Sequence, residues 1–393
     1  MDKSITQSAR ITVVDALRGF ALVTILVLHN IEIFEIHGFQ QSLPAWMIAI
    51  DKVIWDTFFF IFGGKSYAIF ALLFGLTFYI QSHNQEKRGK DFRLRFMWRM
   101  VLLIGFGFIN TLFYQGEILV MYAIIGFFII PFNKLSDKSI FIWALIFLLQ
   151  PIMLIKIIYS SINPDAFSLV PAYIPYYMKV GSVLTEGTML EAMKSNVTNG
   201  RIASLLWLWI NGRFEQTLGL FLLGFLAGRR KIFFNTEENI KFWKRVLLFG
   251  VIFFFPFYIL KYGASSTGRE NFIVNMSASI YGLWANLAMM SVMVSGFILL
   301  FYNRRFQPAL DRFSPIGKMS LTNYILQSIV GATLYYGYGF GLYRFVGPSV
   351  ALFIGILLSV AMWAFSNYWM SRHRRGICES LWHKLTWVGS GEK

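Results

Sequence analysis

The sequence predicts an all-α protein, a polytopic membrane bundle of about ten transmembrane helices. Composition is the first observation: 56% of the residues are hydrophobic, only 14% are charged and the mean hydropathy is +0.56, whereas soluble domains carry about 25% charged residues. The second is a series of apolar runs near the length that crosses a bilayer. The third is that basic residues gather in short loops between alternate runs, the pattern that orients membrane proteins.

The apolar runs follow one another along the chain, so we expect a single bundle over residues 1–393 and no separate soluble domain. A partly amphipathic segment at 46–62 leads into the second span. The turn at 115–117 joins the third and fourth spans in a tight hairpin, and a polar break at 211–213 precedes the sixth. The expected spans cover residues 11–34, 63–81, 96–114, 118–132, 140–158, 214–228, 242–262, 277–302, 316–336 and 349–370.

The distribution of Lys and Arg predicts the orientation of these spans. Most of the 36 basic residues fall in loops on the side of the N-terminus, which is the cytoplasmic side. Both termini are then cytoplasmic, with a basic tail at 371–393, and the polar stretch 159–204 is an extracytoplasmic loop with an amphipathic helix near 188–195. Because this signal explains the net charge of +16, we reject a nucleic-acid partner. We expect a multi-pass protein of the cell (inner) membrane, in contact with the lipid bilayer.

The first span, residues 11–34, carries Asp15, Arg18 and His29 inside an apolar run. Ionisable groups within a membrane helix are costly, and they usually mark a site, a pathway or a buried pair. Arg18 and His29 are eleven residues apart in the sequence, so they share one helix face at about 16 Å. His29 could act as a general base with Glu32 one turn beyond it, and Arg18 could bind a phosphate. Equally, His29 could bond a neighbouring helix and Arg18 could pair with Asp15.

Further polar residues in or beside the spans are candidates for a site. Glu117, two helical turns after Asn110, could bind a substrate or act in acid–base chemistry, although the helix dipole also favours an acid at a helix start. Lys65 could line a pathway or extend towards the membrane surface. Arg213 and Glu215 stand at a broken helix entry and could form an internal ion pair.

Asn323 and Gln327 lie one turn apart in the ninth span, where such residues hold helices together or line a substrate path. The sequence contains no Walker-type phosphate loop, dinucleotide glycine fingerprint or His/Cys metal spacing. Cys378 is the only cysteine, which excludes a disulfide framework. We therefore expect neither a bound metal nor coupling to nucleotide hydrolysis within this chain.

Several short motifs stand along the chain. They are DALRGFA at 15–21, FALLFG at 70–75, GEIL at 116–119 and GKMSLTNYILQS at 317–328, together with Gly376, Glu379 and Trp382. These motifs resemble those of the YeiB-like bacterial membrane proteins, whose C-terminal half is a domain of unknown function. The resemblance runs over essentially the whole chain, and its most specific part lies in the C-terminal signature region, residues 303–393. That family is largely uncharacterised, and a transport role has been presumed for it.

The first-span motif is also similar to those of two membrane acyltransferase groups, the O-antigen and peptidoglycan acetylases and the heparan glucosaminide N-acetyltransferases. The acetylases place an essential histidine eleven residues after the motif arginine, as Arg18 and His29 stand here. The resemblance implies an acyl-CoA donor, acetyl-CoA above all, that enters from the cytoplasm, and an extracytoplasmic hydroxyl or amine acceptor that His29 deprotonates. Glu32 or Glu117 would orient His29 or bind the acceptor. The expected donor-binding residues are Arg18, Asp15, Arg95, Arg99 and Lys65.

The chain also departs from many YeiB-like proteins, which often carry asparagine at the position of His29, aspartate at Glu117 and histidine at Asn110. A second hypothesis is therefore a transporter or exporter of a small metabolite or lipid. Its pathway would be lined by Arg18, Lys65, Arg213 and Glu215, with Asn110, Asn323 and Gln327 as further polar groups along it. A third is an envelope protein without turnover. The sequence leaves the acceptor and the oligomeric state open, a homo-oligomer included.

Overall fold

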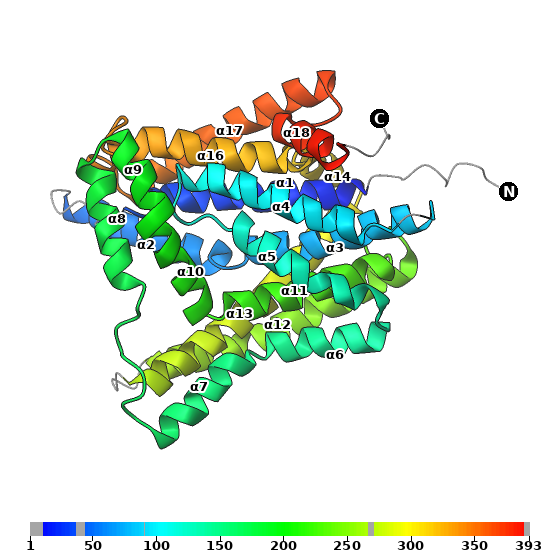
Figure 1. Cartoon of the computed structure of the whole chain (residues 1–393), viewed down its shortest axis with the longest axis horizontal. Coiled ribbons are helices and arrows are strands. Elements are labelled where there is room, and N and C mark those ends of the chain that lie inside the picture. The colour runs from blue at the N-terminus through cyan, green and yellow to red at the C-terminus, as the bar shows by residue number, and fades with distance from the viewer. Residues whose placement is uncertain (1–10, 37–43, 90, 266–270, 389–393) are drawn as a thin grey trace.

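The computed structural model describes residues 11–36, 44–89, 91–265 and 271–388, and every regular element in these ranges is a helix. Figure 1 shows the elements as a bundle of long helices with shorter ones across one end. The first half contains α1 (Thr12–Ile31), η2 (Ile33–Glu35), α2 (Ala45–Phe62), α3 (Ser66–Glu86), α4 (Arg93–Thr111), α5 (Leu119–Ile129), η3 (Ile130–Lys134), α6 (Asp137–Leu148), α7 (Pro151–Ile162), α8 (Ile174–Glu186), α9 (Met189–Ser195) and η4 (Asn196–Gly200). The second contains α10 (Arg201–Ile210), α11 (Arg213–Arg229), α12 (Glu237–Ser265), α13 (Phe272–Phe301), α14 (Gln307–Asp311), α15 (Ser314–Lys318), α16 (Ser320–Tyr335), η5 (Leu342–Arg344), α17 (Pro348–Arg372) and α18 (Ile377–Thr386).

Helix α1 lies in the middle of the bundle and contacts α3, α13, α15, α16 and α17. Its apolar residues point in all directions, so neighbours are needed on every side, and Leu17 and Leu22 are fully buried. Small residues let the backbones approach closely. A Cβ atom at Gly19 would collide with the carbonyl of Phe313, and one at Gly317 with the carbonyl of Asp15.

Within the described ranges, six helical stretches are long and apolar enough to cross a membrane, or seven if the bent pair α6 and α7 is one span. The helical membrane bundle predicted from composition is confirmed, whereas the count of about ten spans is not. The helices α5, α11 and α16 lie in three of the expected spans but are too short to pass on length and hydropathy alone.

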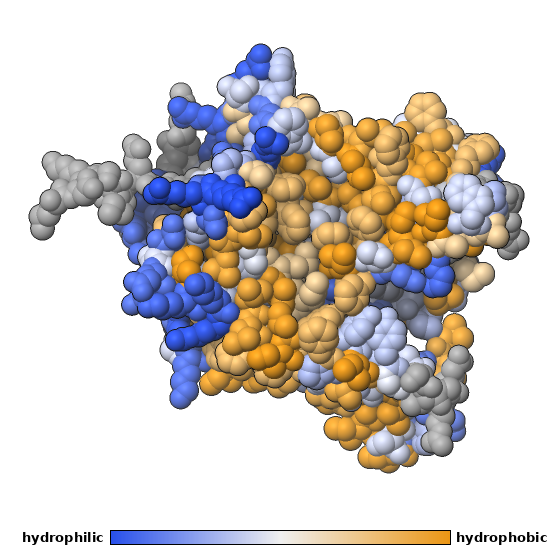
Figure 2. All heavy atoms as spheres, turned by 180° about the vertical axis from the view of Figure 1, so that it is seen from behind, coloured by the Kyte–Doolittle hydropathy of each residue, from blue (hydrophilic) through white to orange (hydrophobic). Residues whose placement is uncertain are grey.

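The outer surface of the bundle is apolar, as a lipid-facing surface requires. Only 11% of the most apolar window of α12 and 22% of that of α17 is buried inside the protein. Hydrophilic residues gather at one end of the molecule in Figure 2, and apolar surface covers most of the middle. The start of α1 and the C-terminal helix α18 lie at the same end of the bundle (Figure 1). This agrees with the expectation that both termini are on one side of the membrane.

The polar stretch 159–204 is more helical than the expected loop. It contains the end of α7, all of α8, α9 and η4, and the start of α10. The amphipathic helix expected near 188–195 is α9, which begins with a capping box between Thr188 and Glu191. Helices α8, α9 and α10 cross one end of the bundle in Figure 1, so this stretch forms part of the wall around the interior.

Two helix breaks shape the interior. The expected break before the sixth span is Asn211–Gly212, and Gly212 has φ of +65°, a conformation that glycine adopts without strain. The expected fifth span is broken at Gln150, which also has a positive φ, and α6 and α7 meet there at 42°. The only sequence signal for that bend is Pro151, the residue that follows Gln150.

Candidate functional site

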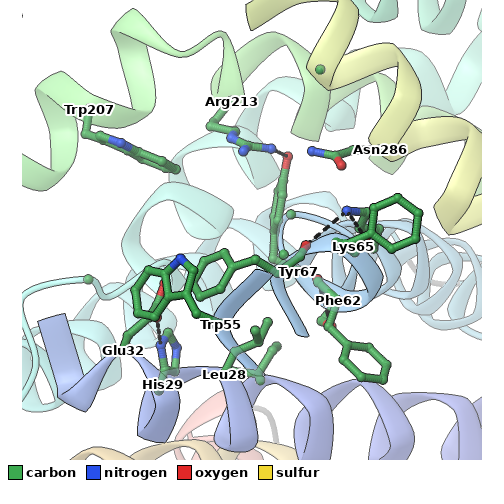
Figure 3. A pocket seen from close by; sticks show the side chains of 18 of the residues that line it. Leu28, His29, Glu32, Trp55, Phe62, Lys65, Tyr67, Trp207, Arg213 and Asn286 are labelled. Carbon is green, nitrogen blue, oxygen red and sulfur yellow. Dashed lines mark hydrogen bonds and ion pairs between the residues drawn. The ribbon is translucent and has the colours of Figure 1, made fainter. Parts of the chain in front are cut away.

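A cavity of about 1670 Å³ occupies the end of the bundle that α8 and α10 cover. Its walls come from α1, α2, the start of α3, the turn between α4 and α5, α8, α10, the start of α11, α12, α13 and α16. Of the residues predicted to form a site, it brings together four: His29, Glu32, Lys65 and Arg213. Figure 3 shows His29 and Glu32 at one side of the cavity and Lys65 and Arg213 at the other.

His29 is held by its own helix end and by the turn between α4 and α5. Its Nδ1 lies 3.0 Å from Oε2 of Glu32 and 3.0 Å from the hydroxyl of Tyr114. The imidazole also packs against the rings of Tyr114 and Phe34, at centroid distances of 4.8 Å and 5.9 Å. No described residue bonds Nε2, and the side chain is 21% exposed. A neutral imidazole that donates its Nδ1 proton to the carboxylate therefore has a basic Nε2 at the cavity wall.

The opposite side of the cavity carries cations. Nζ of Lys65 donates to the carbonyls of Phe59, at 3.3 Å, and Phe60, at 2.7 Å, and thereby caps the end of α2. Arg213 donates from Nη1 to the hydroxyl of Tyr67 at 2.8 Å and to Oε1 of Gln216 at 3.0 Å. Both basic side chains follow helix breaks, and those breaks turn them inwards.

Arg213 and its surroundings form a stacked arrangement. Its guanidinium lies over the rings of Tyr67 and Trp207, at 4.8 Å and 5.4 Å from their centroids. Tyr67 in turn donates its hydroxyl proton to Gln216. The sequence prediction of an ion pair between Arg213 and Glu215 is wrong, because the structure records none between them.

Glu117 lies outside the cavity and forms a buried ion pair instead. Its carboxylate, with no exposed surface, accepts from Nη1 of Arg201 at 3.2 Å and from the amides of Leu119 and Val120 at the start of α5. This is the helix-start arrangement that the dipole favours. The pKa of the Glu117 carboxyl is raised above its ordinary value, because burial disfavours the charged form. The charge of Arg201 opposes this shift without cancelling it.

Asn110 is fully buried on α4, and neither atom of its amide has a hydrogen-bond partner among the described residues. Gln115 Oε1 and Arg201 Nη2 are likewise buried without a described partner. The turn between α4 and α5 therefore holds several unsatisfied polar atoms, which in proteins are usually satisfied by water.

Of the five residues expected to bind the donor, only Lys65 lines the cavity. Nη1 of Arg18 donates to Asp15 at 3.3 Å, and Nη2 donates to Thr77 of α3 at 3.1 Å. Arg95 and Arg99 hold α18: Arg95 donates to the carbonyl of Thr386 at 2.7 Å. The guanidinium of Arg99 lies 4.2 Å from the centre of a Trp382 ring and donates to the hydroxyl of Thr386 at 3.2 Å.

The other expected pathway residues join helices. Glu215 accepts from the amide of Ile152, at 3.2 Å, in the first turn of α7. Asn323 donates to the carbonyl of Ile316 and to Ser366, and so links α16 to α15 and α17. Gln327 donates to the carbonyl of Leu22 at 3.5 Å. For Asn323 and Gln327 this agrees with the helix-joining alternative.

Several residues in the cavity wall, and Arg201 outside it, are absent from the residues predicted to form a site. Tyr67, Tyr114 and Asn286 line the cavity but are ordinary residues for a membrane helix, so no pattern singles them out. Arg201 carries a usable signal, because it is a basic residue at the edge of an apolar run on the outer side, where few basic residues are expected. Among the described residues there is no group of three side chains that could hold a metal ion.

The model of the family described as "Protein of unknown function (DUF418)" matches residues 227–389, from the end of α11 past α18. The C-terminal part of the chain is therefore similar to this family over 227–389. The matched region begins well before the expected signature region, and it supplies the cavity walls on α12, α13 and α16. His29, Lys65 and Arg213 all precede the matched region.

Three relatives extend the similarity over nearly the whole chain, and all are described as uncharacterised. The chain is 27% identical over 400 residues to YxaH of Bacillus subtilis (strain 168), covering 96% of this chain and 94% of that protein. It is 28% identical over 404 residues to YeiB of Escherichia coli (strain K12), covering 96% of both. A 39.9 kDa protein in the amylase 3' region of Bacillus acidopullulyticus is 25% identical over 390 residues. These matches confirm the predicted resemblance to YeiB-like proteins. No solved structure matches the chain.

Proposed function

We propose that this protein is a membrane acyltransferase in which His29 is the general base for an acceptor that enters the cavity. The observation that carries this proposal is the geometry of the imidazole. Glu32 and Tyr114 fix Nδ1, while Nε2 has no described partner at the wall of a large cavity. A base held in one tautomer by a carboxylate is the arrangement that acyl-transfer sites use on unrelated folds.

The chemistry follows from that geometry. Nε2 of His29 takes the proton of an acceptor hydroxyl or amine as the oxygen or nitrogen attacks the acyl carbonyl. The tetrahedral intermediate then re-forms the carbonyl as its C–S bond breaks, and the thiolate that leaves receives the proton from Nε2 of His29. Glu32 is a positioning residue, because its carboxylate orients the ring and stabilises the imidazolium that forms. General-base assistance of this kind contributes roughly 10²- to 10⁴-fold to a rate.

The proposed donor is an acyl-CoA such as acetyl-CoA, but the residues expected for its phosphates do not fit that role in this conformation. Arg18, Arg95 and Arg99 are bonded to protein groups, and none of them lines the cavity. We therefore assign no residue to the donor phosphates. The proposed setting is the cell (inner) membrane, with the cavity on the extracytoplasmic side, since the basic loops lie at the opposite end.

The test uses purified protein in nanodiscs with acetyl-CoA and an extract of host-cell lipids and envelope material as acceptors. Thiol release is followed for the wild type, His29→Gln, Glu32→Gln and the matched control His373→Gln, whose histidine is exposed on the tail side. We expect at least about a 100-fold loss in His29→Gln, a smaller loss in Glu32→Gln and none in the control. Equal rates in the wild type and His29→Gln would contradict the proposal.

Transport of a small metabolite or lipid is the second candidate, and one observation favours it. Helix breaks at Gly64 and Gly212 adjoin the cavity, as in transporters whose broken helices form the substrate site. Two of the expected pathway residues, Lys65 and Arg213, line that cavity. Cysteines placed at the cavity wall and at the opposite end of α1 discriminate the two functions. Substrate-dependent reciprocal changes in labelling would favour transport, and unchanged labelling together with thiol release would favour acyl transfer.

A further inference from the structure

The charges that line the cavity do not balance. Its acidic side chains are Glu32, which is bonded to His29, and Asp56, which pairs with Lys52 at 2.7 Å. Lys65, Arg213 and Lys261 also line the cavity, and none has a carboxylate partner among the described residues. Like charges in a partly enclosed space repel one another, so a group of negative charge would stabilise this side of the cavity.

These cations act on one another and surround a common space. The charges that act most on the ammonium of Lys65 are those of Lys261 and Arg213. A Cβ atom added at Gly64 would lie 2.7 Å from the amide nitrogen of Asn286 and 3.5 Å from Nη2 of Arg213, so these groups meet at the break between α2 and α3. Figure 3 shows Arg213, Asn286 and Lys65 together on that side of the cavity.

Hydrogen-bond donors remain available at this place. The ammonium of Lys65 has three donors and uses two of them on the carbonyls of α2. Arg213 uses only Nη1, and its Nε is buried without any described partner. The guanidinium is only partly buried, and an oxyanion in the cavity would accept from its unused donors.

The number of charges favours phosphate. Three cations exceed what one carboxylate neutralises, whereas a phosphate monoester carries a charge of about −1.5 to −2 at neutral pH. The guanidinium of Arg213 also has the planar arrangement of donors that suits phosphate oxygens. Lys65 and Lys261 add two point charges to the lining of the same cavity.

The rest of the cavity favours a ligand with an apolar part. Its volume of about 1670 Å³ exceeds the roughly 300–1,000 Å³ of ordinary small-molecule sites. Aromatic residues line it next to the cations, including Trp55, Phe60, Phe254 and Tyr258. The ring of Phe60 meets those of Phe254 and Tyr258 at 5.8 Å and 5.3 Å, and Phe60 is 39% exposed. Aromatic side chains of α2 and α12 therefore form an apolar part of the cavity wall.

From these observations we infer that Lys65, Arg213, Lys261 and Asn286 form a binding site for the phosphate group of an anionic lipid, which enters between α2 and α12. Binding of the lipid does not depend on the acyltransferase reaction. That the same lipid presents its hydroxyl or amine to His29 as the acceptor rests on the proposed function. The acceptor would then carry both a phosphate and a nucleophile, separated by the width of the cavity (Figure 3).

Calorimetry on the detergent-purified full chain, without any acyl donor, tests this site. The probes are dioctanoyl phosphatidic acid, dioctanoyl phosphatidylcholine and inorganic phosphate. We expect saturable binding of phosphatidic acid and weakening by about tenfold or more in Lys261→Gln and in Arg213→Gln. The control is Lys52→Gln, whose charge also faces the cavity but is already paired with Asp56. Lys261 is exposed, so its replacement keeps the test valid if Arg213→Gln does not fold.

Equal affinity for phosphatidic acid and phosphatidylcholine, or unchanged affinity in both charge variants, would overturn the anion site. Inorganic phosphate that binds as tightly as phosphatidic acid would overturn the assignment to a lipid. His29→Gln separates the two proposals, because it should bind phosphatidic acid like the wild type. If His29→Gln binds phosphatidic acid like the wild type and also releases thiol at the wild-type rate, the acyltransferase proposal is rejected and the lipid site is retained.

Discussion

The buried pair of Glu117 and Arg201 gives the sharpest expectation about stability. We consider Arg201→Met, which keeps most of the apolar stem and removes the charge. The carboxylate of Glu117 has no exposed surface, and the side chain of Arg201 is only 11% exposed. Without the guanidinium, the carboxylate is left with the amides of Leu119 and Val120 at the start of α5.

The magnitude follows from this geometry. Removing one partner of a buried ion pair costs about 3–5 kcal/mol, because the other charge is left without compensation in a medium of low polarity. Two backbone donors still hold Glu117, so we expect the lower end, about 3 kcal/mol. The double variant Glu117→Gln/Arg201→Met leaves no charge buried. Its loss of unfolding free energy should therefore be about 2 kcal/mol smaller than the sum of the losses in the two single variants.

Reversible unfolding in mixed micelles, followed by tryptophan fluorescence, measures these free energies. The matched control is Arg230→Met, since Arg230 pairs with Asp137 at 2.9 Å with 61% of its side chain exposed. Such an exposed pair contributes about 0–1 kcal/mol. A loss in Arg201→Met no larger than that in Arg230→Met, or strictly additive single effects, would refute the reasoning.

Two further expectations concern packing. Gly19→Ala places a methyl group against the carbonyl of Phe313 and should cost roughly 1–3 kcal/mol in the same unfolding assay; an unchanged free energy would show that α1 and α15 are not in close contact. Arg99→Met removes the guanidinium from the ring of Trp382, worth about 0.5–2 kcal/mol, and should speed limited proteolysis of α18. Resistance equal to the wild type would mean that other contacts hold that helix.

Much of the fold could be predicted because hydropathy acts locally. The length and apolar composition of α12 predict a span, and the polar, glycine-containing sequence around Gly212 predicts the break there. The bend at Gln150 could not be predicted, since it depends on how α6 and α7 pack against α11 and α13. Short helices such as α5, with 11 residues, and α16, with 16, explain why counting apolar runs overstates the number of full-length spans.

The site could be predicted only in part. His29 and Glu32 are one turn apart, so a local rule finds their hydrogen bond. The partner of Glu117 stands 84 residues away, and Arg99 bonds a residue 287 positions away, so these contacts exist only once the bundle has closed. Arg18 and His29 both lie on α1, as their spacing predicts, but only His29 lines the cavity. The guanidinium of Arg18 instead donates to Asp15 and Thr77.

The most direct test of the central claim is the transfer of label from acetyl-CoA carrying a radioactive acetyl group. Wild-type protein and His29→Gln, each shown to be folded by its unfolding transition, are reconstituted in liposomes that contain a host-cell lipid extract. We expect acetyl label in the organic-soluble fraction with the wild type and at least about 100-fold less with His29→Gln. Label incorporated at the same rate by both proteins would contradict it.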